Sequence, residues 1–159
     1  MTNQRLVRRY LTVEIEKLYD KATRLGEVAG RIFGGQRSER SRSQMTNLLN
    51  VANRSDAPAR VISHVKDQAG RHNEWHQENF AADLLEVLEQ DLRAAASRIA
   101  DRLPSPPSEE EFYEIHLQLI REFIVHMKAE YEYSRTLAAA SSRPAGANYA
   151  TQRHGGNRR

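Results

Sequence analysis

Apolar residues recur at intervals of three and four positions along most of this 159-residue chain, and no segment alternates as a β-strand does. This spacing is typical of amphipathic helices, each with one apolar stripe. The pattern therefore predicts an all-α protein, with five helices at about residues 11–33, 44–53, 58–70, 75–103 and 109–140.

Glycine, proline and capping residues set the expected boundaries of these helices. Gly34-Gly35 ends the first helix, and a polar, basic loop follows to residue 43. Ser55 or Asp56 is expected to cap the third helix, with Pro58 in its first turn. Ser108 and the glutamates after it form a capping box that starts the last helix.

The short turn 104–108 predicts that the last two helices form an antiparallel pair about 40 Å long. Residues 1–140 are expected to make a single five-helix bundle domain. Residues 141–159 are rich in Gly, Ser and Arg and contain few apolar side chains. We expect this segment to be a disordered basic tail.

Composition and charge narrow the class of protein. The chain has no cysteine, which excludes a disulfide scaffold and a cysteine-based zinc site. No apolar run approaches a membrane span and no signal peptide is recognisable, so a cytoplasmic protein without a membrane partner is expected. The net charge of +3 divides into +7 over 1–71, −8 over 72–142 and +4 over 143–159. One face can meet a polyanion and the other a basic neighbour.

Catalytic motifs are not evident in the sequence. It contains neither a phosphate-binding P-loop nor the elbow that presents a nucleophilic serine. His72 and His76 are four residues apart, but Asn73 stands where a metalloprotease has its glutamate. This pair would hold zinc only if another helix supplied further ligands. The sequence therefore predicts a protein that is not an enzyme and has no cofactor.

Arginine placement is the main indication of function. Arg guanidinium groups bind phosphate oxygens in pairs, and clusters of them suit a phosphodiester backbone. Exposed aromatic residues are few around these clusters, which favours backbone contact over base stacking. We expect RNA to be contacted by eight basic residues and two amides of the N-terminal half: Arg31, Arg37, Arg40, Arg42, Arg54, Arg60, Lys66, Arg71, Gln44 and Asn47.

Three short motifs resemble one known family. They are Ser43-Gln44-Met45-Thr46-Asn47-Leu48-Leu49, then Gln68-Ala69-Gly70-Arg71, and finally Glu122-Phe123-Ile124-Val125-His126-Met127-Lys128. Together they resemble the helical small subunit of type III CRISPR–Cas effector complexes, over residues 12–135.

The resemblance implies a five-helix, non-catalytic subunit that acts in antiviral defence. Such subunits stack as copies beside the guide–target RNA duplex and contact the other subunits of the ribonucleoprotein complex. Gln44 and Arg71 match the family pattern, and Lys128 falls near its late basic position. Thr46 stands where the family has arginine, and Arg42 lies one helical turn earlier.

Two other classes of function remain open. The helices at 44–53 and 58–70 could form a helix-turn-helix that binds DNA, although the segment between them reads as longer than the usual turn. Alternatively, the chain is a helical scaffold that acts through protein contacts alone. Neutralising the arginines would then leave nucleic-acid affinity unchanged.

Overall fold

The computed structural model describes residues 3–35 and 39–141, apart from the side chains of residues 39–40 and 138–141. Most of the described residues are helical, with no strand among them, which confirms the all-α class. The elements are α1 (Asn3–Phe33), α2 (Glu39–Arg42), α3 (Gln44–Arg54), α4 (Pro58–Arg71), η1 (Asn73–Asn79), α5 (Phe80–Glu86), η2 (Val87–Asp91), α6 (Leu92–Arg102) and α7 (Glu109–Ser141). If α5, η2 and α6 are taken as one helix, five helices longer than two turns lie within the described ranges.

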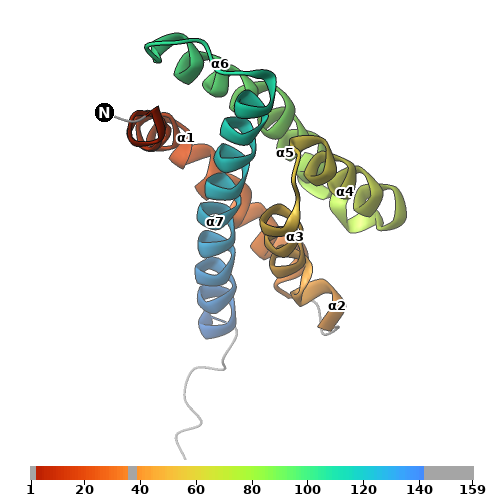
Figure 1. The fold of residues 1–159 in the computed structure, drawn as a ribbon. Helices are drawn as coiled ribbons and strands as arrows, with labels where there is room; N and C mark the ends of the chain where they lie inside the picture. Colours follow the sequence, from red (N-terminus) through yellow and green to blue (C-terminus); the bar gives the residue numbers. More distant parts are fainter. Residues whose placement is uncertain (1–2, 36–38, 142–159) are drawn as a thin grey trace, which may run out of the picture.

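Helix α7 lies at the centre of the molecule, in contact with α1, α3, α4 and α6 (Figure 1). The apolar stripe that the spacing predicts on α7 faces the core: Phe112, Ile115, Leu119, Phe123, Met127 and Tyr131. Its last three members are fully buried. Leu117 and Ile124 are buried as well, outside that stripe. The buried face is wider than the sequence pattern indicates because several helices surround α7.

The most extensive helix contact joins α1 to α7, and the two helices run parallel. Gly26 faces Met127 and Glu130, and four residues later Gly30 faces Ser134, so both helices advance in the same direction. A β-carbon added at Gly26 would lie 2.5 Å from the backbone oxygen of Met127. The glycines therefore allow the two backbones to approach closely.

The long antiparallel pair expected at the C-terminus is not confirmed. Helices α6 and α7 are joined by the predicted turn, but they cross each other instead of running side by side, and α1 is the main partner of α7 (Figure 1). Gly26, Gly30 and Gly34 of α1 all lie close to α7, which makes this contact a tight one.

Several predicted boundaries need correction. Helix α1 begins at Asn3 instead of residue 11, because Leu6, Val7 and Tyr10 continue its apolar stripe. The predicted loop 34–43 contains the single-turn helix α2. The start of α7 is confirmed, with the backbone N–H of Glu111 donating to Ser108 Oγ at 3.1 Å. The predicted tail lies outside the described residues except for Ser141, which ends α7.

The predicted helix 75–103 is wrong at its start. The 3₁₀ segment η1 is interrupted by a kink at Gln77 and Glu78, and Glu78 and Asn79 have φ of 51° and 58°, in the left-handed region. No glycine or proline marks this corner in the sequence. It is covered by an aromatic cluster, in which the Trp75 ring lies 5.3 Å from that of Phe33 and 5.5 Å from that of Phe80. Burial of these rings offsets the cost of the left-handed residues.

The π-helical turn η2 is held by three other helices. His116 of α7 is buried and its Nε2 donates to the carbonyl oxygen of Leu88 at 2.9 Å. Lys66 of α4 pairs with Glu89 at 2.9 Å, and Lys21 of α1 pairs with Asp91 at 2.6 Å. A π-turn displaces its carbonyls from the α-helical hydrogen-bond pattern, and here a histidine binds one of them.

One carboxylate lies inside the core between α1 and α6. Glu14 is 2% exposed and accepts hydrogen bonds from Nε and Nη2 of Arg98, at 3.1 and 2.9 Å. Lys17 lies 3.3 Å away on the other side. Burial alone raises the pKa of Glu14, but the hydrogen bonds from Arg98 and Lys17 outweigh it and lower the pKa below its ordinary value.

Candidate nucleic-acid interface

An open groove separates the outer faces of α3 and α4. Its volume is about 960 Å³. Helix α3 ends at Arg54 and α4 begins at Pro58, so only residues 55–57 connect them. The polar lining of the groove comes from both helices and the turn between them: Asn47, Asn50, Arg54, Ser55, Asp56, Arg60, Ser63, His64 and Asp67.

Hydrogen bonds around the connection fix the geometry of the groove. Neither Ser55 nor Asp56 caps α4, contrary to the prediction; the N-cap residue is Ala57, without a side-chain bond. Ser55 Oγ instead donates to the Val51 carbonyl at 2.6 Å, at the end of α3. Arg121 of α7 also donates to the carbonyls of Ala52 and Ser55, each at 2.9 Å. The C-terminus of α3 is thereby joined to the central helix.

Three residues predicted to contact RNA meet in this groove. Asn47, Arg54 and Arg60 are all exposed and line it together. Arg60 Nε lies 2.8 Å from Asp56, one helical turn away. Arg54 has no ion pair with any residue in the described ranges, so its guanidinium is available to an anion. Surface pairs such as Arg60–Asp56 contribute little to stability and open readily for a competing phosphate.

His64 also lines the groove and is partly buried. Its Nε2 is buried and has no hydrogen-bond partner among the described atoms. Burial lowers the pKa of His64, partly opposed by the nearby carboxylate of Asp67. A neutral imidazole is therefore favoured at neutral pH, and His64 adds polarity to the groove without adding charge.

Other predicted RNA contacts are engaged within the protein. The Arg31 guanidinium binds both oxygens of Glu78, at 2.9–3.2 Å, and so anchors the left-handed corner of η1. The Glu78 hydrogen bonds raise the pKa of Arg31. Lys66 is paired with Glu89 of η2. Lys128 is half-buried, 3.9 Å from Glu132.

The remaining predicted contacts are scattered. Gln44 is only 4% exposed, so the prediction that it contacts RNA is wrong for this conformation. Arg71 is exposed and lies 3.3 Å from Asp67. Arg42 is also exposed, and its backbone carbonyl accepts the Tyr131 hydroxyl at 3.2 Å. Arg37 and the side chain of Arg40 lie outside the described residues.

No protein-family model, curated protein or solved structure matches this chain.

A basic face that the sequence reasoning missed lies at the start of α1. Arg5, Arg8 and Arg9 are exposed, and none of them pairs with a carboxylate within the described ranges. They line a shallow hollow together with Gln4 and Thr12. Arg8 and Arg9 follow Arg5 by three and four residues, a spacing that places side chains on one face of a helix. The sequence therefore indicates this basic face only if the helix begins before residue 11.

The two histidines spaced four residues apart, His72 and His76, have partners within the protein. His76 Nε2 donates to the Ala69 carbonyl at 2.7 Å, near the end of α4. His72 is the C-cap residue of that helix. Within the described residues, no three His, Cys, Asp or Glu side chains are grouped to hold a metal ion.

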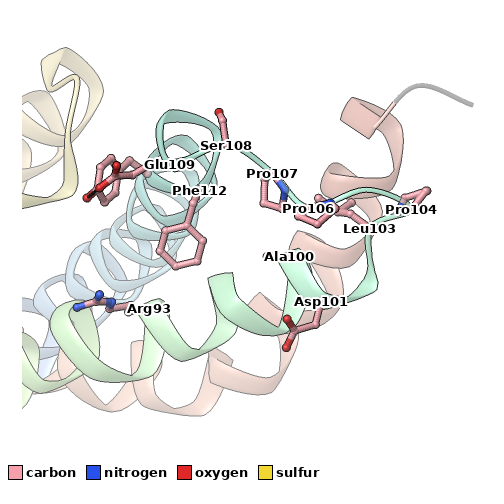
Figure 2. Close-up of a pocket in the computed structure, with 11 residues that line it drawn as sticks. Arg93, Ala100, Asp101, Leu103, Pro104, Pro106, Pro107, Ser108, Glu109 and Phe112 are labelled. Atoms are coloured by element: carbon pink, nitrogen blue, oxygen red, sulfur yellow. Dashed lines mark hydrogen bonds between the residues drawn. The ribbon is translucent and has the colours of Figure 1, made fainter.

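A second hollow, of about 680 Å³, lies where α6 turns into α7. Figure 2 shows Phe112 extending from α7 toward α6, with Pro106 and Pro107 along the turn. Tyr113 also lines it and donates its hydroxyl to Glu109 at 2.6 Å. That carboxylate raises the pKa of Tyr113, so the phenol stays protonated and is a poor nucleophile.

None of the described helices combines the length and apolar composition that crossing a membrane requires.

Proposed function

We propose that this chain is a non-catalytic RNA-binding subunit that holds the phosphate backbone in the α3–α4 groove. The observation that carries the proposal is the meeting of Asn47, Arg54 and Arg60 along one open polar groove. The guanidinium of Arg54, which has no ion pair within the described ranges, can bind a phosphate. The side-chain amides of Asn47 and Asn50 can donate hydrogen bonds to phosphate or ribose oxygens. The groove is open and polar, which suits a strand lying across it better than a small enclosed ligand.

The wider role follows from the sequence resemblance. A helical small subunit of a type III CRISPR effector complex would lie beside the guide–target duplex, in contact with copies of itself and with other subunits. The exposed arginines at the start of α1 could add a second phosphate contact. Gln44, which is buried, and Arg31, which is paired with Glu78, are not expected to contact RNA.

A salt series of RNA binding tests the groove. Anisotropy of a labelled single-stranded RNA and an RNA duplex should be measured with wild type and with Arg54→Ala/Arg60→Ala. Arg24→Ala is the matched control, because Arg24 is an exposed arginine on α1. We expect wild type to bind RNA with little sequence preference. The slope of log affinity against log salt concentration should become shallower by roughly 0.7–0.9 for each phosphate contact that the substitutions remove.

The control distinguishes specific from general effects of charge. If Arg24→Ala weakens RNA binding as much per removed charge as the groove variant does, then the binding depends on net charge and not on the groove. If wild type does not bind RNA even at low salt, the proposal fails.

One structural observation favours a second candidate. The connection between α3 and α4 is three residues long, so the expectation of a turn too long for a helix-turn-helix is wrong. Under this alternative, α4 would enter the major groove of DNA and present Arg60, Ser63 and Lys66. A duplex DNA arm in the same assay separates the two: sequence-selective DNA binding with weaker RNA binding would favour a regulator.

A further inference from the structure

Among the described residues that line the α3–α4 groove, His64 is the only histidine. Its ring is half-buried, and its Nε2 is enclosed by protein without a hydrogen-bond partner among the described atoms. Buried polar atoms in folded proteins are nearly always paired, so an unpaired one needs an explanation. The neutral form with its hydrogen on Nδ1 is favoured here, because it avoids burying an unpaired N–H group.

The charged side chains that line the groove beside His64 are two arginines and two aspartates, from both helices and the turn: Arg54, Asp56, Arg60 and Asp67. Their charges cancel while His64 is neutral. Three further cations lie on neighbouring turns and helices, each bound within the protein: Arg71 to Asp67, Lys66 to Glu89 on the opposite side of α4, and Arg121 of α7 to carbonyls at the end of α3. A proton on His64 would therefore turn a neutral lining into a positive one.

We propose that His64 is a further phosphate-binding residue of the groove, which takes up a proton when an RNA backbone lies there. The inference rests on the proposed function and adds a regulation of it by pH. A phosphate beside the ring stabilises the imidazolium, and the imidazolium in turn strengthens the binding of the phosphate, because the two equilibria are linked. Burial lowers the pKa of His64 in the free protein, in spite of Asp67, so the ring is neutral at pH 7 until RNA brings a compensating charge.

The affinity for RNA should therefore rise as the pH falls. Carboxyl groups titrate at about pH 4 and guanidinium groups stay charged, so among the described residues of the lining only His64 changes its charge between pH 5.5 and 7.5. Uptake of one proton changes the affinity by at most about tenfold per pH unit. In anisotropy measurements at constant ionic strength, we expect wild type to bind RNA about three- to tenfold more tightly at pH 5.5 than at pH 7.5.

Two substitutions separate His64 from the other histidines. His64→Asn keeps a polar atom near the position of Nδ1 but cannot take up a proton, so its affinity should change much less with pH. His76→Gln is the matched control, because His76 is an exposed histidine outside the lining. Glutamine can also keep the hydrogen bond to the Ala69 carbonyl. Circular dichroism at pH 5.5 checks that each protein remains folded.

Nuclear magnetic resonance of the ring protons measures the proton uptake directly. The His64 signal, identified by its loss in His64→Asn, should titrate at a higher pH when RNA is bound. If RNA binds with the same pH dependence to wild type and to His64→Asn, or leaves the titration of His64 unchanged, this inference is overturned and the proposed function stands. If RNA does not bind at any pH, both are overturned.

Discussion

Replacing Gly26 by alanine adds one methyl group where α1 meets α7. In an ordinary helix this change is stabilising, because alanine has a higher helix propensity than glycine by about 1 kcal/mol. At Gly26 the new carbon would lie 2.5 Å from the Met127 carbonyl oxygen and 2.6 Å from the β-carbon of Glu130. Neither atom can move by a side-chain rotation alone, so the helices must separate.

The net effect follows from comparing these two terms. Overpacking of a tight contact costs about 1–3 kcal/mol, and more when backbone atoms must shift. Because the propensity gain of about 1 kcal/mol offsets part of this cost, we expect Gly26→Ala to lower the free energy of unfolding by up to about 2 kcal/mol. For a chain of this size, the midpoint of thermal unfolding should fall by up to about 8 °C.

Gly70 provides the matched control for this prediction. It lies in α4, and a β-carbon added there meets nothing within 4 Å. Gly70→Ala should therefore raise the free energy of unfolding by about 0.5–1 kcal/mol. Urea unfolding followed by circular dichroism measures both variants. If Gly26→Ala is as stable as Gly70→Ala, the close parallel packing of α1 on α7 is wrong.

Two further predictions concern pH. Burial lowers the pKa of His116, with a further decrease from Arg93 and a partial increase from its hydrogen bond, so the unfolded chain binds more protons below pH 6.5. Stability should therefore fall as the pH drops below 6.5, by up to about 1.4 kcal/mol per pH unit. His116→Gln should flatten this dependence in urea unfolding between pH 5 and 8; an unchanged slope would exclude His116 as its source. The lowered pKa of Glu14 gives stability that is present above pH 4.5 and lost as the pH falls further. Glu14→Gln should be less stable than wild type by about 1–2 kcal/mol at pH 7, with the difference shrinking below pH 4; a constant difference from pH 7 to 3 would contradict the pairing with Arg98.

Local features of the fold could be predicted from the sequence, and pairings between distant helices could not. Apolar spacing located α3 and α4 within a residue or two, and Ser108 marked the start of α7. The corner at η1 was missed because Glu78 and Asn79 adopt left-handed backbone without a glycine to signal it. The parallel contact of α1 with α7 was missed because apolar stripes do not identify their partners.

The candidate site shows the same limit. An arginine in a sequence carries no sign of whether a carboxylate will meet it in the fold. Arg31 and Glu78 are 47 residues apart, and their pairing removes a predicted RNA contact. Gln44 is buried by tertiary packing that its polar neighbours in the sequence do not indicate. Arg54 and Arg60 come together because a short turn joins their helices, which is the kind of proximity that a sequence does reveal.

The parallel arrangement of α1 and α7 also dictates an order of events during synthesis. Parallel helices need a long connection, and here about 75 residues separate the end of α1 from the start of α7. The glycine face of α1 leaves the ribosome first but stays without its partner until α7 has emerged. Contacts this distant in sequence close slowly. Folding of this domain should therefore wait for α7, and a chain halted before α7 should leave the apolar face of α1 open to aggregation or to a chaperone.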